Sequence, residues 1–178
     1  MNPKLKTIIC ILAFAPIWLL VYTILHEGGH ALVILAYGGT IDRFWVLGLN
    51  AHVSAHGGVY SAFGEGLKHA AGVFLPMIVS TIAFVYYKPK VKLDGYHYCW
   101  FLMMVSSVFS LLVWIIFPIL SLFRPMPQGE DVMQFISATG FHPLLVSAGA
   151  FLLVGTFMFL MFKSGLLKRV FGKAKGKL

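Results

Sequence analysis

The chain has 178 residues, of which 59% are hydrophobic and 11% are charged, and its formal net charge is +8. A soluble domain has about 25% charged residues, and a chain this short cannot bury so much apolar surface in a water-soluble core. The composition therefore excludes a soluble enzyme, a nucleic-acid-binding module and a disordered tail, so we expect a protein embedded in a lipid bilayer. Cys10 and Cys99 both lie in apolar stretches and indicate neither a disulfide framework nor a cysteine metal cage.

Four apolar runs predict transmembrane helices, at about residues 7–37, 70–87, 98–123 and 144–162. Backbone groups in lipid must be hydrogen-bonded within their own segment, so each run is expected to be helical. The predicted fold is therefore an all-α polytopic membrane protein with about four transmembrane helices in a single membrane-embedded domain, residues 1–178. The first run is longer than the apolar region of a typical signal peptide, so we interpret it as a retained span.

The segment after the first span is expected to be a short extended or β-hairpin structure. Gly38 and Gly39 should end the first helix. Residues 41–49 and 53–60 then form two stretches typical of strands, and Gly57-Gly58 lie within the second. Extended backbone of this kind can approach the bilayer only where protein or water covers its polar groups.

Four further histidines lie near the same membrane face as this segment. His52 and His56 are four residues apart, but on an extended strand this spacing separates them by about 13 Å. We interpret them as histidines of the membrane interface, with a supporting role beside a metal or a substrate as the alternative. His69 and His142 are expected to be capping histidines, or to reach toward the interface, rather than to bind a metal.

The distribution of basic residues predicts the orientation of the spans. Most of the 14 Lys and Arg residues lie at the two termini and in the loop 88–95, which share one side of a four-span protein. Only Arg43, Lys68 and Arg124 lie on the other side. Because positive charges favour the cytoplasmic side, we expect a multi-pass protein of the cell membrane with both termini in the cytoplasm. Residues 163–178 then form a basic cytoplasmic tail.

The end of the first span carries the sequence His26-Glu27-Gly28-Gly29-His30, an HExxH motif. Residues four apart lie on one face of a helix, so both imidazoles can bind one zinc ion, while Glu27 can reach a water molecule. This motif arises by chance in a chain of this composition with a probability of roughly 0.5%. The two glycines remove side-chain bulk, which would let another helix or a substrate strand approach closely.

The chain resembles the site-2 protease family of intramembrane zinc metalloproteases, from the motif at His26 through Gly38-Gly39 and the extended segment to the later helices. The resemblance implies that His26 and His30 bind zinc together with a distant aspartate, and that Glu27 activates water. It also implies a membrane-protein substrate, cleaved in a transmembrane or membrane-proximal segment. The chain departs from the family in having neither a clear Asn-Pro and Asp-Gly pattern in a late helix nor room for a PDZ-like insertion.

Two aspartates compete as the third zinc ligand. Asp94 lies in a Leu-Asp-Gly sequence like that of some site-2 proteases, whereas Asp131 follows the third span. The predicted topology places Asp131 on the face that holds His26 and His30, and Asp94 most of an about 30 Å hydrocarbon core away. A zinc–carboxylate bond is only about 2.0–2.2 Å long, which favours Asp131. A helix-capping role is the alternative for Asp131, and Glu130 is the alternative ligand.

The sequence as a whole predicts an intramembrane zinc metalloendopeptidase that hydrolyses a peptide bond with zinc-activated water. Its partners would be the lipid bilayer and a membrane-protein substrate. A non-catalytic relative that binds a membrane partner is a second hypothesis. A metal transporter is a third, which the near absence of polar residues in the inner halves of the spans disfavours.

Overall fold

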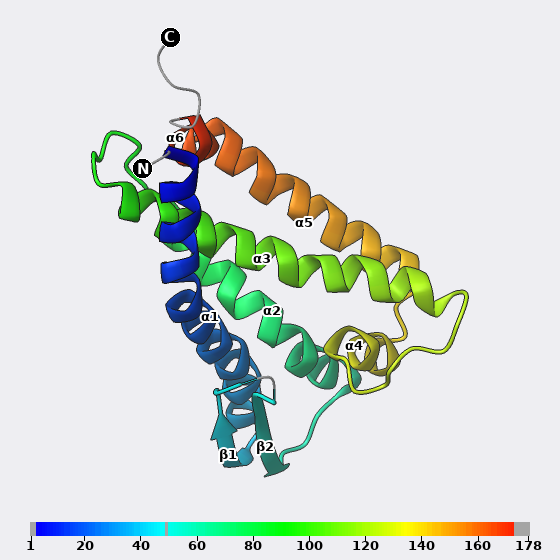
Figure 1. Ribbon diagram of the computed structural model, residues 1–178. Coiled ribbons are helices and arrows are strands. Elements are labelled where there is room, and N and C mark those ends of the chain that lie inside the picture. The colour runs from blue at the N-terminus through cyan, green and yellow to red at the C-terminus, as the bar shows by residue number, and fades with distance from the viewer. Residues whose placement is uncertain (1–2, 49, 173–178) are drawn as a thin grey trace.

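The structure is a computed structural model that describes residues 3–48 and 50–172. It is mostly helical, with one two-stranded sheet inserted after the first helix (Figure 1). The elements in chain order are α1 (Pro3–Ala36), β1 (Gly39–Trp45), β2 (His52–Gly57), α2 (Ala62–Phe84), α3 (Asp94–Ser121), α4 (Asp131–Thr139), α5 (Pro143–Lys163) and α6 (Leu166–Phe171).

Four helices in the described part of the chain are long and apolar enough to cross a membrane. They comprise Ile8–Ala36 of α1 and the whole of α2, α3 and α5. This confirms the predicted number of spans and the all-α fold with its hairpin. The start of α1 and the short helix α6 lie at the same end of the bundle, as four crossings require (Figure 1). The orientation relative to the cytoplasm stays a prediction.

Two boundaries differ from the sequence-based prediction. Helix α2 begins at Ala62 rather than near residue 70, because the Ser61 side chain caps it by accepting a hydrogen bond from the Gly64 amide at 3.1 Å. The predicted basic tail, residues 163–178, contains the helix α6, whose Leu166 and Val170 side chains are buried. Apolar residues four apart allow this short helix to pack against α3. Residues 173–178 of the tail lie outside the described residues.

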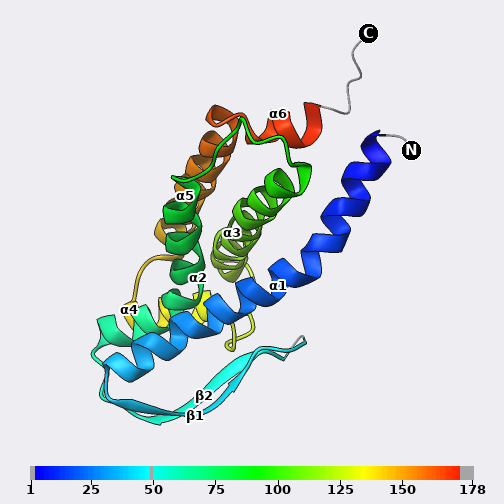
Figure 2. The same ribbon diagram turned by 90° about the vertical axis from the view of Figure 1, so that its left-hand side faces the viewer.

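The predicted hairpin is present and lies against the last turns of α1 (Figure 2). Gly38 has a φ of 78°, a left-handed conformation that ends α1 and turns the chain into β1. Strands β1 and β2 are antiparallel, with Thr40 opposite His56 and Trp45 opposite His52. Leu49, the last residue of the first predicted stretch, lies outside the described residues. The hairpin therefore covers one side of the helix that carries the HExxH motif.

Helix α3 packs against α1, α2 and α5 in the interior of the bundle (Figure 2). Its Met104 and Leu111 side chains are fully buried. Some polar groups of the interior are paired between helices, as an apolar surrounding favours. Three hydrogen bonds do this: Trp18 to Ser106 at 2.8 Å, Ser107 to Ser80 at 3.3 Å and Ser147 to the Ile115 carbonyl at 2.9 Å.

Helices α1 and α2 meet closely at two glycines. A Cβ atom added to Gly29 would lie well inside contact distance of the Ala71 carbonyl oxygen. A Cβ atom added to Gly72 would collide with the imidazoles of His30 and His26. The adjacent Gly28 is different, because its added Cβ would meet only the end of the Leu75 side chain, at an ordinary 3.8 Å. Gly29 and Gly72 therefore allow the motif-bearing turn of α1 to lie directly against α2.

The two glycines of the motif provide a matched test of this packing. We expect Gly29→Ala to lower the thermal unfolding midpoint in detergent, because the new methyl group must push α1 from α2; overpacking of this kind costs about 1–3 kcal/mol. Gly28→Ala should leave the midpoint unchanged or raise it, because alanine favours a helix by up to about 1 kcal/mol over glycine. Equal shifts for the two variants would contradict the close approach.

Candidate metal centre

The HExxH residues lie on the C-terminal part of α1, where the helix rests on α2. The His26 and His30 side chains point to the same side of α1, and their Nε2 atoms are 3.3 Å apart. Their rings stand edge to face, with centroids 4.9 Å apart. The four-residue helical spacing therefore brings two imidazole nitrogens to one point, as predicted.

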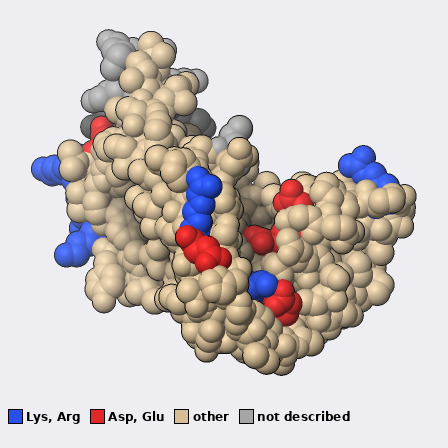
Figure 3. Space-filling view, turned by 90° about the horizontal axis from the view of Figure 1, so that it is seen from below, with Lys and Arg blue, Asp and Glu red and all other residues tan. Residues whose placement is uncertain are grey.

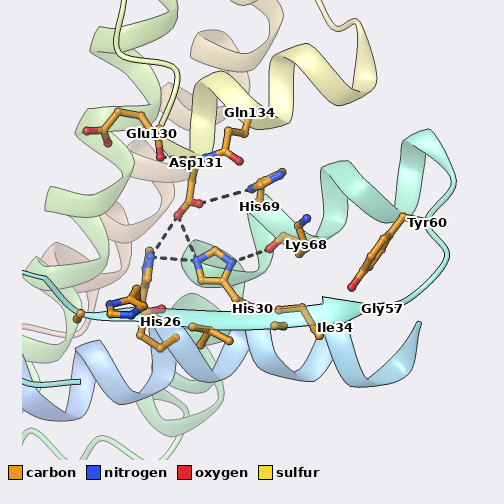
Figure 4. Close-up of a pocket in the computed structure, with 16 residues that line it drawn as sticks. His26, His30, Ile34, Gly57, Tyr60, Lys68, His69, Glu130, Asp131 and Gln134 are labelled. Atoms are coloured by element: carbon orange, nitrogen blue, oxygen red, sulfur yellow. Dashed lines mark hydrogen bonds and ion pairs between the residues drawn. The ribbon is translucent and has the colours of Figure 1, made fainter. Parts of the chain in front are cut away.

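Asp131 is the first residue of α4, a helix that packs against α2 rather than against α1. One of its carboxylate oxygens, Oδ2, lies 3.2 Å from Nε2 of His26 and 3.2 Å from Nε2 of His30. The three ligand atoms lie within 4.8 Å of one another, so His26, His30 and Asp131 could hold a metal ion. These three residues form the candidate metal group. Figure 4 shows the imidazoles converging on the carboxylate. The structure thus brings the three predicted ligands together.

The contacts of His30 determine which of its nitrogens carries a proton. Nδ1 of His30 lies 2.7 Å from the Lys68 carbonyl oxygen, which can only accept a hydrogen bond, so this nitrogen is protonated. Nε2 of a neutral His30 then presents a lone pair to the Asp131 oxygen and to Nε2 of His26. Acceptors this close repel each other unless a cation lies between them. The arrangement therefore fits a bound metal ion or a protonated imidazole.

The Asp131 carboxylate is strongly stabilised in its charged form. Burial alone would raise its pKa, but imidazoles of His26, His30 and His69 that donate hydrogen bonds to it, with a positive charge on His30, outweigh this effect and hold the pKa well below its usual range. Asp131 is therefore ionised at neutral and mildly acidic pH, which is the form that binds a cation. The alternative role of helix cap does not apply to Asp131, because Glu130 is the N-cap residue of α4.

A cavity of about 710 Å³ lies between the hairpin, α1, α2 and α4, and the three residues line it. Glu27 lines the same cavity and is only 6% exposed. Lys68 and Tyr60 lie on its α2 side, where the Lys68 ammonium stands 4.9 Å from the centre of the Tyr60 ring. Figure 3 shows acidic side chains around a hollow in this end of the molecule. The cavity is therefore polar, although it lies among apolar helices.

His69 is a site residue that the sequence analysis missed. It was expected to cap a helix or to reach the interface, but it is 8% exposed, with Nδ1 3.7 Å from Asp131 and Nε2 3.3 Å from Glu65. Hydropathy alone does not reveal this role of His69, because Glu65 and His69 precede the apolar run from which the second span was predicted. The Ser61 capping signal would have placed both residues on one helical face, four residues apart.

The two alternative ligands do not join the group. Asp94 begins α3 at the other end of the bundle, where the neighbouring Gly95 lies against Phe14 of α1. Phe14 precedes His26 by twelve residues, or about 18 Å along the helix axis. Glu130 lines the cavity, but Asp131 is the acidic residue of α4 that reaches both imidazoles.

The other predicted histidines have separate surroundings. His52 lines the cavity from β2, and its Nδ1 lies 2.7 Å from the Asn50 carbonyl oxygen. His56 is exposed and forms an ion pair with Asp42 on β1, at 2.7 Å. His142 precedes α5 and accepts a hydrogen bond from the Leu144 amide at 3.3 Å, which confirms the predicted capping role. Of this set, only His52 faces the metal group's cavity.

We expect the purified protein to bind a divalent metal through the three converging residues. The double variant His26→Ala, His30→Ala should lose the metal, and Asp131→Ala should bind it more weakly because one of three ligands is removed. Asp94→Ala should keep it, because this carboxylate lies at the opposite end of the bundle. The check is elemental analysis of each variant after dialysis against a weak chelator. A loss of metal in Asp94→Ala and its retention in Asp131→Ala would contradict the assignment.

No known protein family, curated protein or solved structure matches this chain. The chemistry of the site is therefore inferred from its own residues and their geometry.

Proposed function

We propose that this protein is an intramembrane zinc metalloendopeptidase, similar in its site to the site-2 protease family. Its substrate would be a membrane protein, hydrolysed in a transmembrane or membrane-proximal segment. The observation that carries the proposal is the convergence of His26, His30 and Asp131 at a cavity that the buried Glu27 also lines. Two of the four helices long enough to cross a membrane, α1 and α2, line this polar site.

The donor set and its spacing favour zinc. Two imidazole nitrogens and one carboxylate oxygen are common ligands of catalytic zinc, which keeps one position open for a reactant. Ligand atoms arranged tetrahedrally at 2.0–2.1 Å from a zinc ion are about 3.3–3.4 Å apart. The three pairs of ligand atoms here are 3.3, 3.2 and 3.2 Å apart. A set of oxygen atoms, which calcium and magnesium prefer, is not what these residues offer.

Each residue of the motif has a distinct part in the proposed reaction. Zinc, when bound, supplies a Lewis acid that polarises a carbonyl group and makes water more acidic. The Glu27 carboxylate accepts a proton from the attacking water and donates it to the departing amine. The Lys68 carbonyl fixes the ring of His30 through Nδ1, and His69 orients the Asp131 carboxylate from the other side. The hairpin shields the cavity, and β2 lines it.

The positive-inside pattern supports a location in the cell membrane with both termini in the cytoplasm. In this orientation the metal group and the hairpin lie toward the opposite face. The hydrolysed bond would therefore lie near that face of the bilayer. The polar lining of the cavity, which includes Lys68 and Gln134, would hold the water that hydrolysis consumes.

Glu27→Gln is the most direct test of this function. The amide keeps the size of the side chain but cannot accept the proton of water, so peptidase activity should fall by at least 10²–10⁴-fold, the usual contribution of a general base. Zinc content should equal that of the unchanged protein, because Glu27 is not one of the ligands. Cleavage of a panel of transmembrane peptides and elemental analysis measure the two quantities.

Different outcomes would select different functions. An active Glu27→Gln protein would contradict the assigned general base. A protein that binds zinc and membrane peptides but cleaves none of them would instead be a non-catalytic relative. Zinc uptake into sealed vesicles that requires His26 and His30 would indicate the transporter, which the described structure does not specifically favour.

A further inference from the structure

The end of the bundle opposite the candidate metal group is strongly basic. It holds the start of α1, the loop 85–93 between α2 and α3, and the helix α6 (Figure 1). Asp94 is the only acidic residue at this end of the described chain, and it is half-buried. The surface here is therefore dominated by positive charge. Its exposed basic residues, among those whose side chains the structure describes, are Lys88, Lys90, Lys92, Lys163, Lys168 and Arg169.

Helix α6 holds two of these charges in a fixed position. Gly165, with a φ of 75°, turns the chain out of α5, and Figure 2 shows α6 running across the end of the bundle rather than along it. The buried side chains of Leu166 and Val170 anchor α6 to the bundle, whereas Lys168 and Arg169 are exposed. An apolar side toward the protein and a charged side toward the outside are typical of a helix at a membrane surface.

The loop between α2 and α3 is also fixed, although it has no regular secondary structure. The Lys88 amide donates a hydrogen bond to the Tyr96 hydroxyl at 2.7 Å. Nε2 of His97 donates one to the Val91 carbonyl oxygen at 2.8 Å, since a carbonyl can only accept. The rings of Tyr87 and Tyr96 stack with their centroids 5.8 Å apart. The loop therefore presents its lysines from a backbone that is hydrogen-bonded to the start of α3.

The loop and α6 lie close together, so their charges form one surface. The Phe171 ring of α6 meets the Phe101 ring of α3 edge to face, with centroids 5.2 Å apart, and Phe101 follows His97 by one helical turn. Burial raises the pKa of the Tyr87 hydroxyl, and the positive charge of Arg169 counteracts this rise, which places Arg169 near the loop. We define the basic surface as the exposed cations of these two segments, Lys88, Lys90, Lys92, Lys168 and Arg169.

Exposed apolar side chains flank the lysines of the loop. Val85 and Tyr86 are 79% and 71% exposed, and Leu93 is 69% exposed. They lie at the boundary of the apolar layer, because α2 ends at Phe84 and α3 begins at Asp94. A soluble anion would contact only the charges of this region. A phospholipid with an anionic headgroup would contact the charges and the apolar side chains together.

We propose that the basic surface binds the headgroup of an anionic phospholipid in the leaflet that this end of the bundle faces. The guanidinium of Arg169 offers paired donors that match a phosphate group, and the lysines of the loop add positive charge beside it. This inference goes beyond the predicted orientation, because the positive-inside pattern counts charges and assigns no bound lipid to them. It is also independent of the proposed function, because neither the candidate metal group nor Glu27 takes part.

The test compares two phospholipids that have the same acyl chains and the same dansyl label, the anionic phosphatidylglycerol and the zwitterionic phosphatidylcholine. Each is titrated into the purified protein in a non-ionic detergent, and binding is followed by energy transfer from the protein's tryptophans to the label. Phosphatidylglycerol should bind about 5-fold more tightly for each basic residue that acts on its headgroup. Raising the salt concentration from about 0.05 M to about 0.5 M should reduce this preference, because salt screens exposed charges.

The double variant Lys88→Gln, Arg169→Gln removes one charge from the loop and one from α6, so it should lower the preference by about 25-fold. The double variant Arg43→Gln, Arg124→Gln is the matched control. It removes the same net charge from exposed residues at the other end of the bundle and should leave the preference unchanged. Phosphatidylcholine binding and the thermal unfolding midpoint should be the same in all three proteins, because every substituted side chain is exposed.

Equal affinity of the unchanged protein for the two phospholipids would overturn the proposal. An equal loss of preference in the two double variants would also overturn it, because net charge rather than the basic surface would then determine binding. Glycerol phosphate, a soluble compound with the same phosphate chemistry, should not displace the labelled phosphatidylglycerol. Displacement would show that the surface binds free phosphate and would overturn the assignment to a lipid. If Lys88→Gln, Arg169→Gln lowers the unfolding midpoint, Lys90→Gln, Lys168→Gln replaces it, with the same expected loss.

Discussion

The close contact of α1 with α2 at Gly29 and Gly72 is the constraint on which the site depends. Neither glycine could carry a side chain without displacing a carbonyl group or an imidazole. The contact places Nδ1 of His30 within 2.7 Å of the Lys68 carbonyl and so fixes the proton on that ring. It also positions α2 as the support for α4, which carries Asp131. The polar site can therefore form between helices whose other surfaces are apolar.

The sequence was sufficient to predict the elements whose signals are local. Hydropathy located the four spans, and helical spacing placed His26 and His30 on one face. The predicted topology then favoured Asp131 over Asp94 as the third metal ligand. Counting the spans is enough to decide which helix ends lie at the same face of the membrane. The hairpin was also predictable, because Gly38 ends α1 and two strand-like stretches follow.

The other features of the site depend on contacts between distant parts of the chain, which no local sequence pattern predicts. The first turns of α2 are polar because Glu65, Lys68 and His69 lie near the cavity, so a hydropathy threshold excludes them from the helix. The position of His69 beside Asp131 depends on how α4 packs across α2.

The order of the metal group along the chain has a consequence for biosynthesis. His26 and His30 leave the ribosome first, and the two spans α2 and α3 must follow before Asp131 is made. At about 5–20 residues per second, this interval lasts on the order of 5–20 s. Two imidazoles alone form an incomplete site during that time. A metal ion held by all three residues would therefore bind only to chains that have inserted three spans, and it would act as a final stabiliser of correctly assembled protein rather than as a guide to insertion.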